Sequence, residues 1–400
     1  MCIRDRAWRD RPGVGRLAGF LTGWMYWYFW VIVVALEAVA GADLVRYWLP
    51  DVPNWSISLV LLVMLTLTNL VSVKSFGEFE FWFASIKVAA IVVFLFVAGV
   101  YVLGLTPASQ GMHFGNLTGN GGFMPNGIVP VLTGAVAATG FYFGAEIVTI
   151  AAAETAEPQK AVAKATSSVI TRVLVFYVGS IFLVACLVPW NAVGIATPYV
   201  SALNTMGVPA AAQIMNAIVL TAVLSALNSG LYASSRMLFA LTRRGDAPQA
   251  LAKVSRNGVP TRAILVATVF GYGAVVMSYV SPDKVFAFLV NSYGTVAIFV
   301  YILIAISQLR LRSRLEREAP HLLKVRMWCY PYLTWFAIFG MLSIVIAMAF
   351  IPEQRTPLAL GVASLCILLL AYGVRQLLQR GVAPVVSSLS EAAQPEPQKY

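Results

Sequence analysis

The chain has 400 residues, of which 59% are hydrophobic and only 11% are charged. An average soluble chain is about 25% charged, so this one has too little polar surface to cover a water-soluble globule. The composition excludes a cytosolic enzyme, a disordered chain and a disulfide scaffold, and it predicts an integral membrane protein with many spans. We attribute the formal net charge of +11 to basic loops that orient the chain, and we expect no nucleic-acid partner.

Ten apolar stretches are approximately long enough to cross the hydrocarbon core, which takes about 20 helical residues. They predict an all-α, polytopic membrane helix bundle. In chain order they are Leu17–Ala42, Trp55–Val73, Phe81–Leu105, Gly127–Ala153, Thr166–Trp190, Val208–Ser235, Ala263–Val280, Val285–Leu309, Met327–Ile351 and Thr356–Val374. No linker is long enough for a soluble domain, so we expect residues 1–380 to form one membrane domain and residues 381–400 a mobile cytoplasmic tail.

Basic residues are distributed unevenly between alternate loops. Only Arg46, Lys284 and Arg355 fall on one side and Lys87 lies within a span, whereas every other Lys and Arg falls on the opposite side. Because Lys and Arg accumulate in cytoplasmic loops, we expect both termini in the cytoplasm. The expected location is a bacterial inner membrane.

Three ionisable residues lie more than two turns from the end of a span, namely Glu37, Lys87 and Glu146. A charge in hydrocarbon is costly, so such residues usually face the bundle interior and mark a transport pathway. Lys87 either extends to the headgroups or faces the interior, where it can gain and lose a proton. Glu37 could equally be a solvated residue at the mouth of the bundle, a structural partner of another residue, or a residue with a role in transport.

Glu146 closes the stretch ATGFYFGAE (Ala138–Glu146), in which Gly140 and Gly144 bracket an aromatic block. The block consists of Phe141, Tyr142 and Phe143. Glycine inside a helix weakens it by roughly 1 kcal/mol relative to alanine. The combination predicts a discontinuous helix whose free backbone groups bind a charged or polar substrate, although small residues at a close helix crossing would give a similar pattern.

Two further spans carry polar residues at mid-depth. The stretch LSALNSG (Leu224–Gly230) contains Ser225 and Asn228, and the stretch NSYGT (Asn291–Thr295) contains Asn291, Ser292 and Tyr293. Such residues either hydrogen-bond neighbouring helices together or line a binding site. The sequence alone leaves both interpretations open.

Several enzyme and cofactor motifs are missing from the sequence. It contains no GxxxxGK[ST] loop, no HExxH and no G-x-S-x-G, so ATP hydrolysis, metalloprotease and hydrolase chemistry are not indicated. No His or Cys cluster has the spacing of a metal or haem site. A carrier without enzymatic activity or cofactor is therefore the leading class.

Five stretches together resemble the amino acid permeases of the amino acid–polyamine–organocation superfamily, most closely the GABA permease type. The resemblance extends from about Gly15 to Arg380. The stretches are GWMYWYFWVIVVALEA (Gly23–Ala38), NLVSVKSFGEFEFWFASIKV (Asn69–Val88), FYFGAEIVTIAAAETAEP (Phe141–Pro158), LNSGLYASSRML (Leu227–Leu238) and FLVNSYGTVAIFVYILIAISQLRLR (Phe288–Arg312).

The resemblance implies a fold of twelve spans, built as a five-plus-five inverted repeat followed by two extra helices. The first span here matches the third of the family, so we expect a truncated fold that lacks the first two helices. Residues 17–105 would be the remainder of the first repeat, residues 127–309 the second repeat, and residues 327–374 the two extra helices.

The resemblance also implies roles for individual residues. The broken helix and the far wall of the pocket would bind substrate through Phe141, Tyr142, Phe143, Gly144, Glu146, Asn291, Ser292 and Tyr293. A second group would couple transport to protons, namely Lys87, Ser225 and Asn228.

The expected function is secondary active transport, with proton-coupled uptake (symport) of GABA or a related neutral amino acid. The partners implied are the amino acid, protons and the lipid bilayer. The alternative is a membrane binding or scaffold remnant of a carrier that does not transport. A channel or receptor is a weaker reading, because the broken helix and Lys87 are typical of carriers.

Overall fold

The computed structural model describes residues 15–71, 73–107, 109, 114–138, 142, 144, 158–192, 197–255, 258–320, 323, 327 and 329–391. Within these ranges every regular element is a helix. The α-helices are α2 (Gly15–Val45), α3 (Asn54–Val71), α4 (Val73–Val102), α5 (Ile128–Ala138), α7 (Pro158–Arg172), α8 (Gly179–Leu187), α9 (Pro198–Thr205), α10 (Ala211–Arg243), α11 (Thr261–Val280), α12 (Pro282–Glu318), α13 (Tyr332–Phe350) and α14 (Pro352–Glu391).

In the described part of the chain, 9 helical segments are long and apolar enough to cross a membrane. They confirm nine of the expected spans. The remaining one, expected at Gly127–Ala153, is described only in α5 and at two later residues. Helices are the expected solution, because a backbone in hydrocarbon must satisfy its polar groups within its own segment.

Helix ends extend beyond the apolar stretches that predicted them. The span expected at Thr166–Trp190 begins as α7 at Pro158 and passes through a π-helical segment, η3 (Val173–Val178), into α8. Likewise α14 runs on to Glu391, through part of the segment expected as a tail. Hydropathy marks the part of a helix that lies in hydrocarbon, whereas the backbone ladder continues through polar helix-forming residues.

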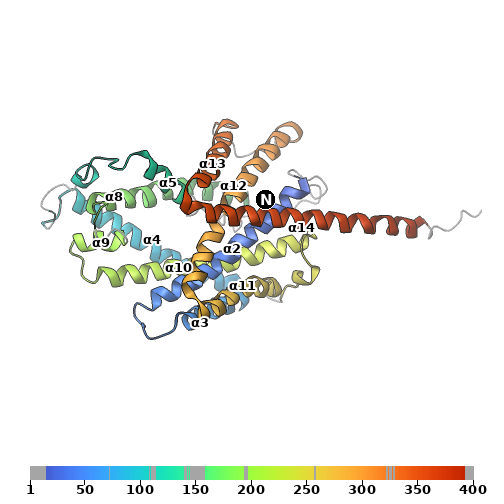
Figure 1. Ribbon diagram of the computed structural model, residues 1–400, viewed down its shortest axis with the longest axis horizontal. Helices are drawn as coiled ribbons and strands as arrows, with labels where there is room; N and C mark the ends of the chain where they lie inside the picture. The colour runs from blue at the N-terminus through green and yellow to red at the C-terminus, as the bar shows by residue number, and fades with distance from the viewer. Residues whose placement is uncertain are drawn as a thin grey trace, which may run out of the picture.

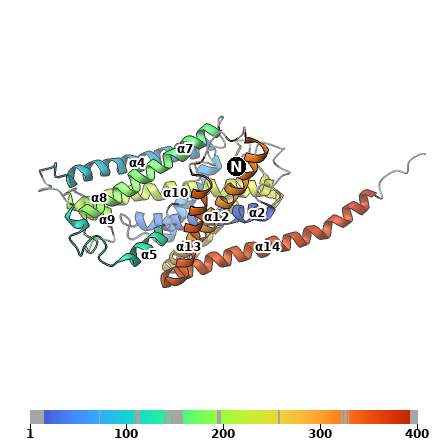
Figure 2. The same cartoon turned by 90° about the horizontal axis from the view of Figure 1, so that it is seen from above.

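The centre of the bundle is α2, which packs against α10, α12, α11 and α3 (Figure 1). Its buried residues lie all round the helix, as expected for an apolar helix enclosed by others. On one side of this group, α4 and α8 pack against each other. Figure 2 shows α14 extending away from the bundle beyond its contacts with α12 and α13.

Gly230 allows α10 to pack closely against α2. A methyl group added there would lie 2.9 Å from Cγ2 of Val34 and 3.3 Å from Cε3 of Trp30. Membrane helices associate through packing at small residues, because lipid provides no hydrophobic driving force between them. Gly230 therefore brings the aromatic part of α2 directly against α10.

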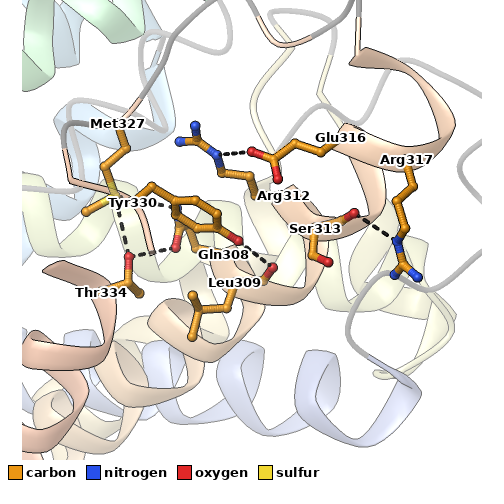
Figure 3. Close-up of polar contacts among 9 residues, drawn as sticks. All are labelled: Gln308, Leu309, Arg312, Ser313, Glu316, Arg317, Met327, Tyr330 and Thr334. Atoms are coloured by element: carbon orange, nitrogen blue, oxygen red, sulfur yellow. Dashed lines mark hydrogen bonds and ion pairs between the residues drawn. The ribbon is translucent and has the colours of Figure 1, made fainter. Parts of the chain in front are cut away.

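Polar contacts fix the corner between α12 and α13 (Figure 3). The Thr334 hydroxyl donates to Oε1 of Gln308 at 3.1 Å, and the Tyr330 hydroxyl donates to the carbonyl of Leu309 at 3.2 Å. The guanidinium of Arg312 lies 4.1 Å from the centre of the Tyr330 ring, a favourable cation–π distance. This corner forms the polar, basic end of α12.

Candidate functional site

The half-buried Lys87 side chain of α4 points towards α10. Its Nζ donates a hydrogen bond to Oγ of Ser225 on α10 at 2.7 Å. Ser225 is only 1% exposed. Two carboxylates act on the charge of Lys87, Glu80 on its own helix and Glu37 on α2. Of the two orientations that the sequence left open for Lys87, the structure shows the one that faces a neighbouring helix, beside Ser225.

Asn228 lies one turn beyond Ser225 but bonds to a different helix. Its Oδ1 accepts a hydrogen bond at 2.9 Å from Nδ2 of Asn69 on α3, which also donates to the carbonyl of Leu65 at 2.9 Å. Both asparagines are buried. The structure therefore gives Asn228 an interhelical bond, and no direct bond to Lys87 is seen among the described residues.

The predicted interruption of the fourth expected span is present. Helix α5 is described as far as Ala138, and Gly144, within the same expected span, has a φ of +113°, which is outside the helical region and disfavoured for residues with a Cβ atom. A Cβ at Gly144 would lie 3.5 Å from the Trp30 ring of α2. The carbonyl of Tyr142 accepts a hydrogen bond from the Tyr301 hydroxyl of α12 at 3.3 Å. Gly144 therefore lies beside α2 and Tyr142 beside α12.

Aromatic side chains of α2, α12 and η3 lie beside Gly144 and Tyr142. Phe29 contacts Trp30 and Tyr293, with ring centres 5.2 Å and 5.7 Å apart, and Glu37 acts electrostatically on Tyr293. The ring of Tyr142 packs against Tyr177 of η3 at 5.7 Å. The aromatic residues Phe29 and Trp30 of α2 thus contribute to this region.

Among the other predicted site residues that the structure describes, Asn291 and Ser292 make no contact with this arrangement that the structure shows, and Tyr142 joins it while remaining partly exposed. Asn291 and Ser292 hydrogen-bond within α12, to the carbonyls of Ala287 at 2.7 Å and Phe288 at 2.6 Å. The side chain of Tyr142 is 44% exposed. Three predicted residues lie outside the described residues: Phe141, Phe143 and Glu146.

Sequence reasoning missed three residues that the structure brings into contact with the site. Glu80 was discounted because it precedes the expected span, although it lies seven residues before Lys87 and thus on the same face of α4. Asn69 was read only as part of an apolar run. Trp30 was placed in an aromatic block that left its individual contact unassigned.

Comparison with known proteins places these features in a family. Residues 11–377 match the amino acid permease family. The gamma-aminobutyric acid permease of Bacillus subtilis (strain 168) is 53% identical over 360 residues, covering 90% of this chain and 77% of that protein. That of Escherichia coli (strain K12) is 45% identical over 344 residues, covering 86% and 74%. An aromatic amino acid transport protein of Corynebacterium glutamicum is 39% identical over 324 residues, covering 80% and 70%. The chain therefore belongs to the amino acid permease family, as a GABA permease-like amino acid transporter of the membrane.

Proposed function

We propose that this permease takes up GABA or a related neutral amino acid together with protons. The observation that carries the proposal is the Lys87 ammonium, which is held by Ser225 inside the bundle. Ionisable residues at such depth form ion pathways and proton relays in transporters. Protonated, Lys87 stands in for a bound cation and ties α4 to α10; deprotonated, it releases that tie and favours reopening of the site.

The substrate proposal is supported by the interrupted helix and by the names of the relatives. A zwitterionic amino acid needs donors for its carboxylate and acceptors for its ammonium group. Unwound backbone and half-helix ends provide both in carriers. We assign the ammonium end to the backbone near Gly144, with Phe141, Tyr142 and Phe143 as gate and Glu146 adjusting the local charge. GABA as the substrate is supported by the two GABA permeases among the relatives.

The far wall of the pocket is assigned to α12. Tyr293 lies beside Phe29, which supports its role. Asn291 and Ser292 would contribute after a rotation that breaks their bonds to their own helix. Asn228 supports the coupling site by holding α10 against α3.

The orientation proposal is that both termini are cytoplasmic in a bacterial inner membrane. It is supported by the asymmetry of Lys and Arg between alternate loops. Reporter fusions after Arg314 and at Gly119 test it. The expected result is an internal signal at Arg314 and an external one at Gly119, and the reverse pattern would refute the orientation.

The transport proposal is tested with purified protein in liposomes that are acidic outside. Labelled GABA should accumulate inside above its external concentration, and collapse of the proton gradient should release it. An excess of each neutral amino acid in turn defines the specificity. Binding of GABA without flux would instead support a binding or scaffold protein.

A further inference from the structure

A continuous hydrogen-bonded path connects Lys87 to a carboxylate on its own helix. The Ser225 hydroxyl accepts from Nζ of Lys87 at 2.7 Å and donates to Oε1 of Glu80 at 2.7 Å. The one hydroxyl therefore bridges an ammonium and a carboxylate. We propose that Glu80 receives the proton of Lys87 through Ser225 and passes it towards the end of the bundle at which α4 begins.

Helix geometry explains why these groups meet. Glu80 and Lys87 are seven residues apart, which places them on one face of α4 and about 10 Å apart along its axis. Side chains on a helix lean towards its N-terminus, so the long Lys87 side chain leads back towards Glu80. Ser225 then fills the remaining gap from α10. Glu80 thus lies between Lys87 and the helix end at Val73.

The transfer conserves atoms and charge. One Nζ–H bond of Lys87 breaks as that proton bonds to Oγ of Ser225, and the original hydroxyl proton of Ser225 passes to Oε1 of Glu80. The products are a neutral amine, an unchanged serine hydroxyl and a neutral carboxylic acid. Two half-buried charges bridged by Ser225 are thereby converted into a neutral pair, which lowers the cost of keeping charges partly desolvated.

A second observation concerns the other carboxylate oxygen of Glu80. Its other carboxylate oxygen, Oε2, is buried without a hydrogen-bond partner among the described residues. A buried acceptor without a partner is costly, and more so when it is charged. Protonation removes the charge from the group that the structure leaves incompletely bonded.

The other groups around Lys87 are less suited to this role. Glu37 acts on Lys87 from α2, and it also acts on Tyr293 of α12, on the side where the substrate is proposed to bind. From α3, the nearby polar residue Asn69 is an amide and does not titrate. No hydroxyl bridge from Lys87 to Glu37 is seen in the described part of the chain. The Ser225 bridge therefore singles out Glu80 as the proton acceptor.

This inference depends on the proposed proton coupling and is tested in the full chain reconstituted in liposomes. Glutamine at position 80 keeps an acceptor for the Ser225 hydroxyl but takes up no proton. We expect Glu80→Gln to reduce accumulation of GABA driven by a proton gradient by about tenfold or more, while exchange of GABA at equal concentrations falls far less. Ser225→Ala should behave similarly, and Ser225→Thr, which restores a hydroxyl, should recover coupling.

Two matched variants provide the controls. Ser85→Ala removes a hydroxyl that bonds only to its own helix, at the carbonyl of Phe81, and Glu353→Gln neutralises a carboxylate in the first turn of α14. Both should couple as the parent does. The inference is overturned if Glu80→Gln accumulates GABA against its gradient with the parental pH profile.

An infrared measurement tests the same step without substrate. When the pH is lowered, the parent should show the carbonyl stretch of a buried protonated carboxyl group. This band should be lost in Glu80→Gln and shifted in Ser225→Ala. Parental spectra in both variants would refute the relay. Because this experiment needs no GABA, its outcome is separate from failure of the proposed transport activity.

Discussion

The asparagine pair between α3 and α10 allows a quantitative test of the packing beside the coupling site. Nδ2 of Asn69 bonds at 2.9 Å both to Oδ1 of Asn228 and to the carbonyl of Leu65. Nδ2 of Asn228 has no partner among the described residues. Leucine at position 69 therefore leaves the whole Asn228 amide without a bond, whereas leucine at position 228 leaves Asn69 its bond to Leu65.

The two substitutions should differ in magnitude. A buried polar group left without a partner costs about 1–3 kcal/mol, so Asn69→Leu should lower the free energy of unfolding by that amount. Asn228→Leu should be nearly neutral, because it also removes an unbonded donor. Interhelical hydrogen bonds in membrane proteins average about 0.6 kcal/mol and reach about 1.7 kcal/mol. We therefore expect the double variant to lose about 1 kcal/mol less free energy of unfolding than the two single variants lose in sum.

Reversible unfolding in mixed micelles measures this coupling as a double-mutant cycle. Thr66→Val is the control partner on α3, because its hydroxyl bonds only to the carbonyl of Leu62 in its own helix. Its cycle with Asn228→Leu should show no coupling. If Asn69→Leu and Asn228→Leu are additive, or if Asn228→Leu is the more damaging change, the proposed pairing is wrong.

Three further substitutions probe the contacts around the site. Gly230→Ala should lower the free energy of unfolding by about 1–3 kcal/mol through overpacking against α2. The control Gly273→Ala adds a methyl group that meets nothing within 4 Å, so it should be neutral or stabilising. Equal effects of the two substitutions would contradict the close packing at Gly230. Asp246→Asn should destabilise the chain by about 1 kcal/mol, since Oδ1 of Asp246 accepts a 2.5 Å charged hydrogen bond from Arg375 of α14. An unchanged midpoint of thermal unfolding would argue against that contact. In a competition assay, Trp30→Phe should allow bulkier neutral amino acids to compete better, because the Trp30 ring lies 3.5 Å from the Cβ position of Gly144. An unaltered specificity would mean that substrate binds elsewhere.

The helix bundle and the inward orientation favoured for Lys87 could be predicted because hydrocarbon neither hydrogen-bonds polar groups nor solvates charges. Backbone groups must be paired within the helix, so long apolar runs predict helices, and a deep charge must face protein. The non-helical backbone at Gly144 was predictable for a similarly local reason, since glycine weakens a helix and tolerates a positive φ.

Partners between helices could not be predicted in this way. Asn69 and Glu80 find their partners only where α3 and α4 pack against α10. Nothing in their local sequence specifies Asn228 or Ser225 as the partner. Asn291 shows the same limit. Its polar side chain in mid-span left a binding role and a helix contact equally open, and the structure shows its Nδ2 bonded to the carbonyl of Ala287 within its own helix.

The central claim is that Lys87 couples amino acid movement to protons, and Lys87→Met tests it most directly. Methionine has a similar length without a charge, so folding should be largely preserved. In liposomes with an imposed proton gradient, we expect the variant to lose both the accumulation of labelled GABA and its pH dependence, while exchange at equal concentrations persists. Accumulation of GABA against its gradient by Lys87→Met, with the pH profile of the parent, would contradict the account.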